Sequence, residues 1–463
     1  MAKSTGLTCK FGKEIMNKSK KNWTLIGIIT IMLFIFLLGY MQTTKNRDKE
    51  RDTEQIEEAI DAEGATSEDD SSESGDINTS EMSEEVIPDD GLAENASLEG
   101  VEENNESIAD ETENISSDPE TDAQEKYIDF VMNSMSLHEK VCQMILPSFA
   151  TLSGVNGAKI SGDITKKALE DYPVCGIIYD SSNFESEEQT KQMLSDVKEF
   201  SKIPLILTLD EEGGRVARLM PKFSDAIIGP MFMYKSQGTE TAYNNAAIIA
   251  ANIKNYGFNM DMAPVADVWS NSANKVIGDR AYSDDYNEAA ELVSAAVSGF
   301  HSGKVGCTLK HFPGHGDTLE DSHYGAAYVG KTLDELREGE FLPFKAGIDA
   351  GADAVMIGHL IVSDISDEPA LFSKEIVTDI LRGELGFEGV VITDSLQMKA
   401  MTDYYGEDEV AVRAIEAGCD ILLMPNDIGV TAGAIEKALE DGRLSEERIN
   451  ESVRRILRLK YSF

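Results

Sequence analysis

Residues 305–311 read VGCTLKH, a short apolar run that closes on a lysine and a histidine. Seven further runs of this kind lie on either side of it: VCQMILPSF (141–149), VCGIIYD (174–180), PLILTLD (204–210), GFNMDMAP (257–264), ADAVMIGH (352–359), GVVITD (389–394) and CDILLMP (419–425). Longer segments of helical period separate the runs, for example 239–256 and 287–303. Such alternation is typical of βα units and a parallel sheet.

Eight strand–helix units within residues 127–463 predict an α/β fold, a (β/α)₈ TIM-type barrel with some insertion. A doubly wound sheet is the alternative. The barrel is favoured by polar residues at or just past the C-terminal ends of the runs, namely Asp210, Asp261, Lys310, His311, His359 and Asp394. In a barrel these ends form one active-site face, where the side chains would converge. Taken singly, each aspartate is also explained as a helix cap.

Charge falls into three blocks along the 463 residues. Residues 1–49 carry nine Lys/Arg and two acidic residues, residues 50–125 carry 29 Asp/Glu and one basic residue, and the remainder carries 31 basic and 53 acidic residues. The formal net charge of −43 argues against nucleic acid as a partner, because phosphate binding requires a basic surface. The five cysteines show neither a disulfide framework nor zinc spacing.

Residues 23–41, WTLIGIITIMLFIFLLGYM, contain no charged side chain. A helix of 19 residues spans roughly 28 Å, about the hydrocarbon thickness of a bilayer. Six lysines in the basic segment 1–22 precede it, which favours a cytoplasmic N-terminus. We therefore predict a single-pass cell-membrane protein with its globular part outside the cytoplasm. The alternative is a cleaved signal peptide, although the apolar run is long and no small-x-small site follows it.

Residues 42–126 are rich in Glu, Asp, Ser and Asn and almost lack aromatic side chains. Such a segment buries too little apolar surface to offset its ordering entropy, so we predict a disordered acidic linker. It is either a stalk that holds residues 127–463 away from the membrane or a solubilising spacer.

Residues 310–323, KHFPGHGDTLEDSH, form the segment richest in reactive side chains. Pro313, Gly314 and Gly316 predict a loop. A metal site is one interpretation, but zinc-binding histidines at i, i+4 normally lie on a helix, and we predict no metal. A structural role is expected for His315. The third interpretation is acid/base catalysis by Asp321 and His323, in which the carboxylate fixes the imidazole tautomer and leaves the other nitrogen free to exchange a proton.

This loop, together with DEEGGRVAR (210–218), IGDRAY (277–282) and GVVITDSLQM (389–398), resembles the β-N-acetylglucosaminidases of glycoside hydrolase family 3. The resemblance covers residues 127–463. It implies retaining hydrolysis of terminal non-reducing β-linked N-acetylglucosamine, with peptidoglycan fragments as the expected substrate and no cofactor. It also implies a single-domain form, since the C-terminal α/β sandwich domain of many members is not expected here. IIYDSSNF (177–184) departs from the family pattern.

The resemblance also assigns roles to particular residues. Asp394 matches the catalytic nucleophile, and His323 matches the acid/base with Asp321 as its dyad partner. Five residues match those that bind the terminal sugar: Asp210, Arg218, Arg280, Lys310 and His311. The chemistry is coherent, because an oxocarbenium-like transition state needs an anion near the anomeric carbon and a proton donor at the leaving oxygen. Phosphorolysis, a β-glucosidase and a non-catalytic glycan-binding protein remain as alternatives.

Overall fold

The computed structural model describes residues 119–319 and 327–462. The predicted membrane helix at 23–41 and the linker up to residue 118 lie outside the described residues, as do Asp321 and His323. Within the described ranges, no helix combines the length and apolar character needed to cross a bilayer.

Each of the eight predicted apolar runs overlaps a strand. These strands are β1 (Ile145–Leu146), β2 (Gly176–Ile178), β3 (Ile206–Thr208), β4 (Met260–Asp261), β5 (Gly306–Phe312), β7 (Ala354–Ile357), β9 (Val390–Thr393) and β10 (Leu422–Leu423). All of their residues are buried. Parallel strands covered on both faces are expected to appear in the sequence as continuous apolar runs.

The strands pair in parallel, and the order of pairing returns to its start. Ladders join β2 to β3, β4 to β5, β5 to β7, β7 to β9, and β10 to β1. Further backbone hydrogen bonds make the other links, for example the following three. The Ile178 N–H donates to Pro147 O at 3.0 Å, that of Asn259 to Leu207 O at 3.1 Å, and that of Ile421 to Val391 O at 3.1 Å.

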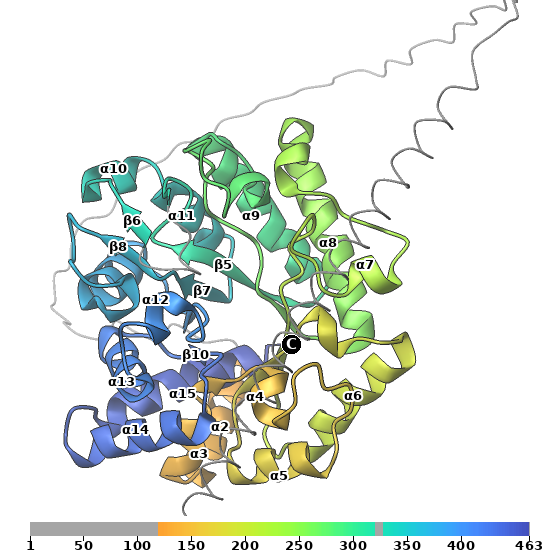
Figure 1. The fold of residues 1–463 in the computed structure, drawn as a ribbon, viewed down its shortest axis with the longest axis vertical. Helices are drawn as coiled ribbons and strands as arrows, with labels where there is room; N and C mark the ends of the chain where they lie inside the picture. The colour runs from red at the N-terminus through yellow and green to blue at the C-terminus, as the bar shows by residue number, and fades with distance from the viewer. Residues whose placement is uncertain (1–118, 320–326, 463) are drawn as a thin grey trace, which may run out of the picture. The chain divides into compact units, whose positions relative to one another are not determined.

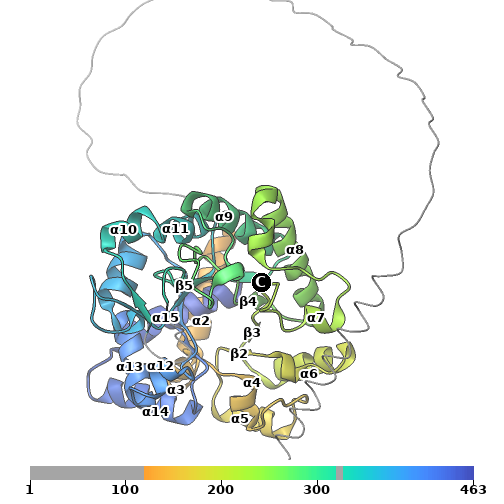
Figure 2. The same ribbon diagram turned by 45° about the horizontal axis from the view of Figure 1, so that its top comes forward.

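Helices surround these strands in both views (Figures 1 and 2). The longer ones are α2 (Pro119–Ser134), α5 (Asp163–Asp171), α6 (Glu187–Phe200), α8 (Gly238–Tyr256), α9 (Tyr286–Ser302), α11 (Phe341–Asp349), η5 (Glu375–Glu384), α13 (Glu407–Ala417), α14 (Ile428–Glu440) and α15 (Glu446–Lys460). The shorter ones are α3 (Leu137–Cys142), α4 (Phe149–Ser153), η1 (Ser181–Asn183), α7 (Met220–Phe223), η2 (Met231–Gln237), η3 (Gly278–Arg280), α10 (Leu333–Glu338), η4 (Ala370–Phe372) and α12 (Lys399–Thr402).

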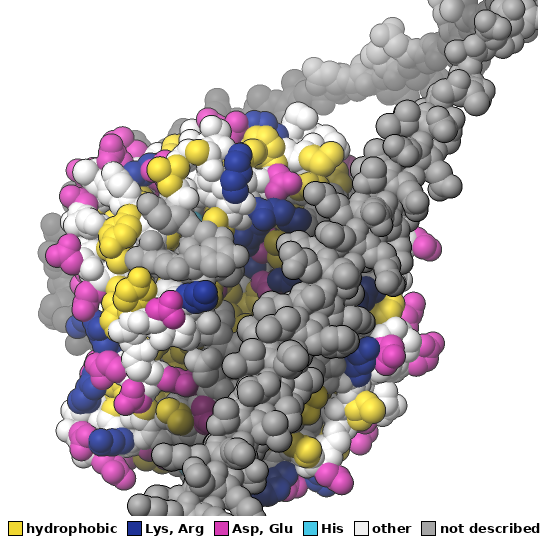
Figure 3. Space-filling view, viewed as in Figure 1, with side chains coloured by type: hydrophobic (Ala, Val, Ile, Leu, Met, Phe, Trp, Pro, Cys, Tyr) yellow, Lys and Arg dark blue, Asp and Glu magenta, His cyan; other side chains and the backbone are white. Residues whose placement is uncertain are grey.

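The surface of the described part carries charges of both signs. Acidic and basic side chains are interspersed over the face drawn in Figure 3. Ion pairs join some of them, such as Arg337 Nε with Glu384 Oε1 at 2.8 Å.

Two features differ from the sequence prediction. Strands β6 (Ala327–Val329) and β8 (Leu360–Val362) form a separate two-stranded parallel sheet that we did not predict. In addition, α2 begins at Pro119, so assigning residues 119–126 to the disordered linker is wrong. The reason is tertiary contact, because Glu125 accepts hydrogen bonds from two arginines of α15, Arg454 and Arg458.

Candidate active site

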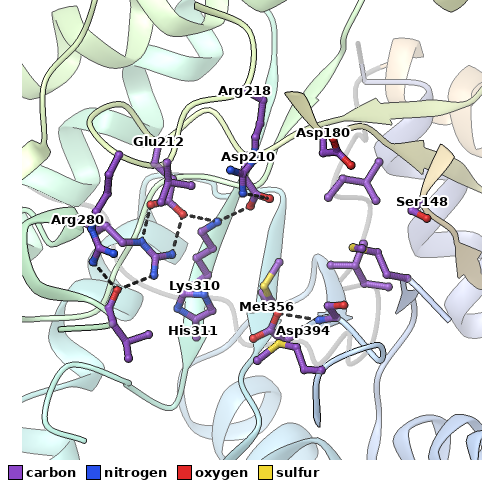
Figure 4. Close-up of a pocket in the computed structure, with 18 of the residues that line it drawn as sticks. Ser148, Asp180, Asp210, Glu212, Arg218, Arg280, Lys310, His311, Met356 and Asp394 are labelled. Atoms are coloured by element: carbon purple, nitrogen blue, oxygen red, sulfur yellow. Dashed lines mark hydrogen bonds and ion pairs between the residues drawn. The ribbon is translucent and has the colours of Figure 1, made fainter. Parts of the chain in front are cut away.

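A cavity of about 630 Å³ opens at the C-terminal ends of the strands. Asp210 follows β3, Lys310 and His311 are part of β5, and Asp394 follows β9 directly. Arg218 reaches the same cavity from a loop, and Arg280 reaches it from the end of the short helix η3. The structure thus brings together six of the eight residues selected from the sequence (Figure 4). The other two, Asp321 and His323, lie outside the described residues.

Lys310 lies at the centre of a buried network of opposite charges. Its Nζ is 2.7 Å from Asp210 Oδ1 and 2.7 Å from Glu212 Oε1. Glu212 in turn accepts two hydrogen bonds from Arg280, at 2.7 Å from Nε and 2.8 Å from Nη2. Arg218 Nη2 lies 3.6 Å from Asp210 Oδ2. Cations and carboxylates therefore alternate along one wall of the cavity.

The network keeps its members charged in spite of their burial. Burial disfavours the charged form of Lys310, but Asp210 and Glu212 outweigh this effect and raise the lysine pKa. Burial likewise opposes ionisation of Glu212, and the neighbouring Arg280 and Lys310 outweigh it, so the pKa of Glu212 lies well below its usual range. At neutral pH this wall presents fixed charged groups suited to binding hydroxyls.

His311 is oriented by Asp267, a fully buried side chain. Asp267 Oδ2 lies 2.7 Å from His311 Nδ1 and also accepts the His311 backbone N–H at 3.1 Å. Asp267 Oδ1 accepts the backbone N–H of His315 at 2.7 Å. Burial opposes ionisation of Asp267, but the two histidines outweigh it and lower its pKa. Because an ionised carboxylate only accepts, Nδ1 carries the proton, and Nε2 is the nitrogen left for a ligand.

Asp394 is fixed by the end of strand β9. Its backbone N–H donates to Ile357 O of the adjacent strand at 2.9 Å, and its Oδ1 accepts the Ser395 N–H at 2.7 Å. Figure 4 shows Asp394 across from Lys310 and Glu212. A carboxylate and a wall of polar groups thus face one another in a single cavity.

Three other polar residues are buried instead of lining the cavity, namely Asp261 and His359 at predicted strand ends and His315 in the loop after β5. Asp261 Oδ1 accepts the Glu211 N–H at 2.9 Å, and burial raises its pKa well above the ordinary value. His359 Nε2 lies 2.8 Å from the carbonyl oxygen of Ser395, the residue after Asp394. His315 Nδ1 lies 2.7 Å from Thr318 Oγ1, which agrees with the structural role expected for this histidine.

Residues 136–459 match the profile described as Glycosyl hydrolase family 3 N terminal domain. The chain belongs to glycoside hydrolase family 3. Beta-hexosaminidases of Stenotrophomonas maltophilia K279a and Xylella fastidiosa M23 are each 37% identical to it over 278 residues, which is 59% of this chain and 82% of each relative.

Solved structures agree with this membership. The family 3 β-N-acetylglucosaminidase from Paenibacillus sp. str. FPU-7 superposes with a TM-score of 0.67 at 36% identity, covering 71% of this chain and 63% of that one. M. tuberculosis LpqI gives a TM-score of 0.65 at 28% identity, covering 72% and 96%. The family resemblance predicted from the motifs is therefore confirmed, and the chain is a glycoside hydrolase.

Sequence reasoning missed two residues that hold the site of this family 3 hydrolase, Glu212 and Asp267. Glu212 stands inside the quoted motif DEEGGRVAR, where only its first and last residues were selected. The motif turns sharply at Gly213 and Gly214, which have φ values of +85° and +58°. A Cβ on Gly214 would lie 2.8 Å from Pro230 Cα, so only glycine fits there. Asp267 lies just past an apolar run, and that position was its only signal.

Proposed function

We propose that this chain is a β-N-acetylhexosaminidase that removes terminal non-reducing β-linked N-acetylglucosamine with retention of configuration. The main support is the single cavity in which Asp394 faces the network of Asp210, Lys310, Glu212 and Arg280. The names of the relatives, beta-hexosaminidase and β-N-acetylglucosaminidase, support this substrate class. Peptidoglycan fragments are the natural substrate that we propose.

In this mechanism Asp394 is the nucleophile. Its carboxylate attacks the anomeric carbon while His323 gives a proton to the leaving oxygen, which breaks the glycosidic bond and forms a covalent glycosyl-enzyme. In the second step His323 takes a proton from water, and the resulting hydroxide displaces Asp394. Asp321 accepts a hydrogen bond from His323 and fixes its tautomer. The roles of Asp321 and His323 rest on their sequence motif.

The five remaining predicted residues would bind the terminal sugar. Asp210, as an acceptor, and Lys310 with Arg218, as donors, are suited to neighbouring hydroxyl groups. His311 offers Nε2, while Nδ1 is engaged by Asp267. Arg280 is held in place by two hydrogen bonds that its Nε and Nη2 donate to Glu212. These contacts would hold the anomeric carbon toward Asp394, and positioning of this kind accounts for a large share of enzymatic rate enhancement.

We also infer that the eight strands form a (β/α)₈ barrel. The support is the pairing order, which runs from β1 through β10 and back to β1 by ladders and backbone hydrogen bonds. A doubly wound sheet would leave two edge strands without a partner on one side.

For the N-terminal part we propose a membrane anchor at residues 23–41, with the catalytic part outside the cytoplasm. Its support is the uncharged run of 19 residues and the lysines that precede it. Fractionation of cells expressing the full chain, followed by protease treatment of intact cells, tests both the anchor and its orientation.

Product analysis on N,N′-diacetylchitobiose, with and without inorganic phosphate, tests the proposed reaction. We expect free N-acetylglucosamine from the wild type in both conditions, and none from Asp394→Asn. Asp349→Asn is the matched control, because this exposed carboxylate pairs only with Lys345 among the described residues and lies on helix α11. A sugar 1-phosphate product would identify a phosphorolase. Turnover of β-glucosides alone would identify a glucosidase, and binding without turnover would identify a glycan-binding protein.

A further inference from the structure

We propose a second site in this chain, a transition-metal site formed by His301, Cys307 and Asp353. It lies at the N-terminal ends of the strands, opposite the catalytic cavity. His301 is near the end of α9, Cys307 is the second residue of β5, and Asp353 directly precedes β7. One ligand atom from each residue lies within 4.8 Å of the other two, the only such group of three that the described residues contain.

The distances are close to those that a bound ion imposes. His301 Nε2 lies 2.9 Å from Asp353 Oδ2 and 4.0 Å from Cys307 Sγ. With ordinary zinc–ligand bond lengths, a tetrahedral ion holds nitrogen and oxygen roughly 3.3 Å apart and nitrogen and sulfur roughly 3.6 Å apart. Changes of about 0.4 Å in these two distances would match them to a tetrahedral ion. The third pair of ligand atoms, from Cys307 and Asp353, lies within 4.8 Å.

Within this cluster Asp353 and Cys307 are held by hydrogen bonds and burial, whereas His301 is partly exposed to solvent. Asp353 Oδ2 also accepts the Cys307 backbone N–H at 2.9 Å, and the Asp353 carbonyl accepts the N–H of Val390. Cys307 is fully buried. The His301 side chain is 36% exposed, which gives an ion a route to the thiol. The fourth position of a tetrahedral ion would be filled by water.

The ligand types select the class of ion. One thiolate, one imidazole and one carboxylate suit Zn²⁺ and its spectroscopic substitute Co²⁺, whereas Mg²⁺ and Ca²⁺ prefer oxygen ligands alone. On binding, the Cys307 S–H bond breaks and its proton passes to solvent as the sulfur–metal bond forms, with no change in oxidation state.

Titration of the metal-free full chain with Co²⁺ tests this site. We expect one Co²⁺ per chain, a thiolate-to-metal charge-transfer absorption, and displacement of Co²⁺ by Zn²⁺. Cys307→Ser should abolish this absorption, and His301→Gln, a change at a partly exposed side chain, should weaken binding at least tenfold. Glycosidase activity should persist in both variants, because neither residue lines the catalytic cavity.

Cys419→Ser is the matched control, since Cys419 is an equally buried free thiol near the start of β10. It should leave the absorption unchanged. The proposal is overturned if Co²⁺ binds without the thiolate absorption, or if the wild type does not bind one Co²⁺ per chain. It is also overturned if Cys419→Ser loses the absorption as fully as Cys307→Ser does. It does not depend on the proposed substrate.

Discussion

Glu212 holds Arg280 through two parallel hydrogen bonds, with Oε2 2.7 Å from Nε and Oε1 2.8 Å from Nη2. The same Oε1 lies 2.7 Å from Lys310 Nζ. The side chains of all three residues are less than a tenth exposed. One carboxylate thus compensates two buried cations, and both cations line the catalytic cavity.

Replacing Glu212 by Gln should damage both activity and stability. The substitution keeps the side-chain shape but leaves two buried cations without this counter-charge, and breaking a buried ion pair typically costs about 3–5 kcal/mol. We expect kcat/KM to fall by about 10²-fold, since a small misplacement of binding groups has effects of that size. Steady-state kinetics on an N-acetylglucosaminide and urea unfolding measure the two effects.

Glu384→Gln is the control for Glu212→Gln. Arg337 and Glu384 form the same bidentate pair, at 2.8 Å on both sides, but on the surface. Surface pairs contribute about 0–1 kcal/mol, so this variant should keep full activity and nearly full stability. Similar losses in the two variants would contradict the role assigned to burial.

Asp267→Asn should impair activity through His311. The Asp267 carboxylate accepts three hydrogen bonds, from two backbone N–H groups and from the Nδ1–H of the His311 ring. The asparagine amide replaces one acceptor oxygen by an NH₂ donor, so at least one of these hydrogen bonds must be lost. We expect the fall in kcat/KM to equal that of His311→Gln to within a few fold. If Asp267 acts by orienting this ring, the double variant should be no worse than the more damaged single variant. Additive losses would show that the two residues act independently.

Asp261→Asn should change how stability depends on pH. Burial raises the pKa of Asp261 in the folded protein, so the folded state binds a proton more tightly than the unfolded state. The stability that Asp261 contributes is therefore fully present below the ordinary carboxyl pKa and is lost as pH rises toward the raised pKa. Between these two values the free energy of unfolding falls by about 1.4 kcal/mol per pH unit for one proton.

The difference between wild type and Asp261→Asn reports on this proton. Glu211, whose pKa is also raised by burial, titrates in both proteins, and its charge is one of the causes that raise the pKa of Asp261. Unfolding free energies measured from pH 4 upward should thus fall less steeply in the variant. Parallel curves for the two proteins would show that Asp261 does not hold the proton.

The strands could be predicted well because a strand that is buried on both faces appears in the sequence as a run of apolar residues. Every residue of β5 is buried, and the run around it is continuous enough to detect without a partner. The pairings were harder to predict. Glu212 and Arg280 are hydrogen-bonded although 68 residues separate them in the sequence, and Asp267 and His311 are separated by 44. The local periodicity of the sequence does not show which side chains come into contact over such separations.

The errors at the edges of the fold have the same origin. Helix α2 lies in an acidic segment whose composition predicts disorder, and Glu125 gains its ion pair with Arg458 from a helix 333 residues later. Strand β6 contains Tyr328, which is about half exposed, so the run is too short and too mixed to predict a strand.

His323→Ala should discriminate between substrates by their leaving groups. In the proposed mechanism His323 protonates the leaving oxygen, and a sugar leaving group needs that proton far more than an activated phenol does. We expect a fall of about 10²–10⁴-fold on N,N′-diacetylchitobiose and a much smaller fall in glycosyl-enzyme formation from a nitrophenyl N-acetylglucosaminide. His315→Gln is the matched control in the same segment, because His315 is buried and lies 2.7 Å from Thr318 through Nδ1. That variant should lower both rates by the same factor. Equal losses on both substrates in His323→Ala would remove this histidine from the acid role while leaving the assignment of Asp394 untouched.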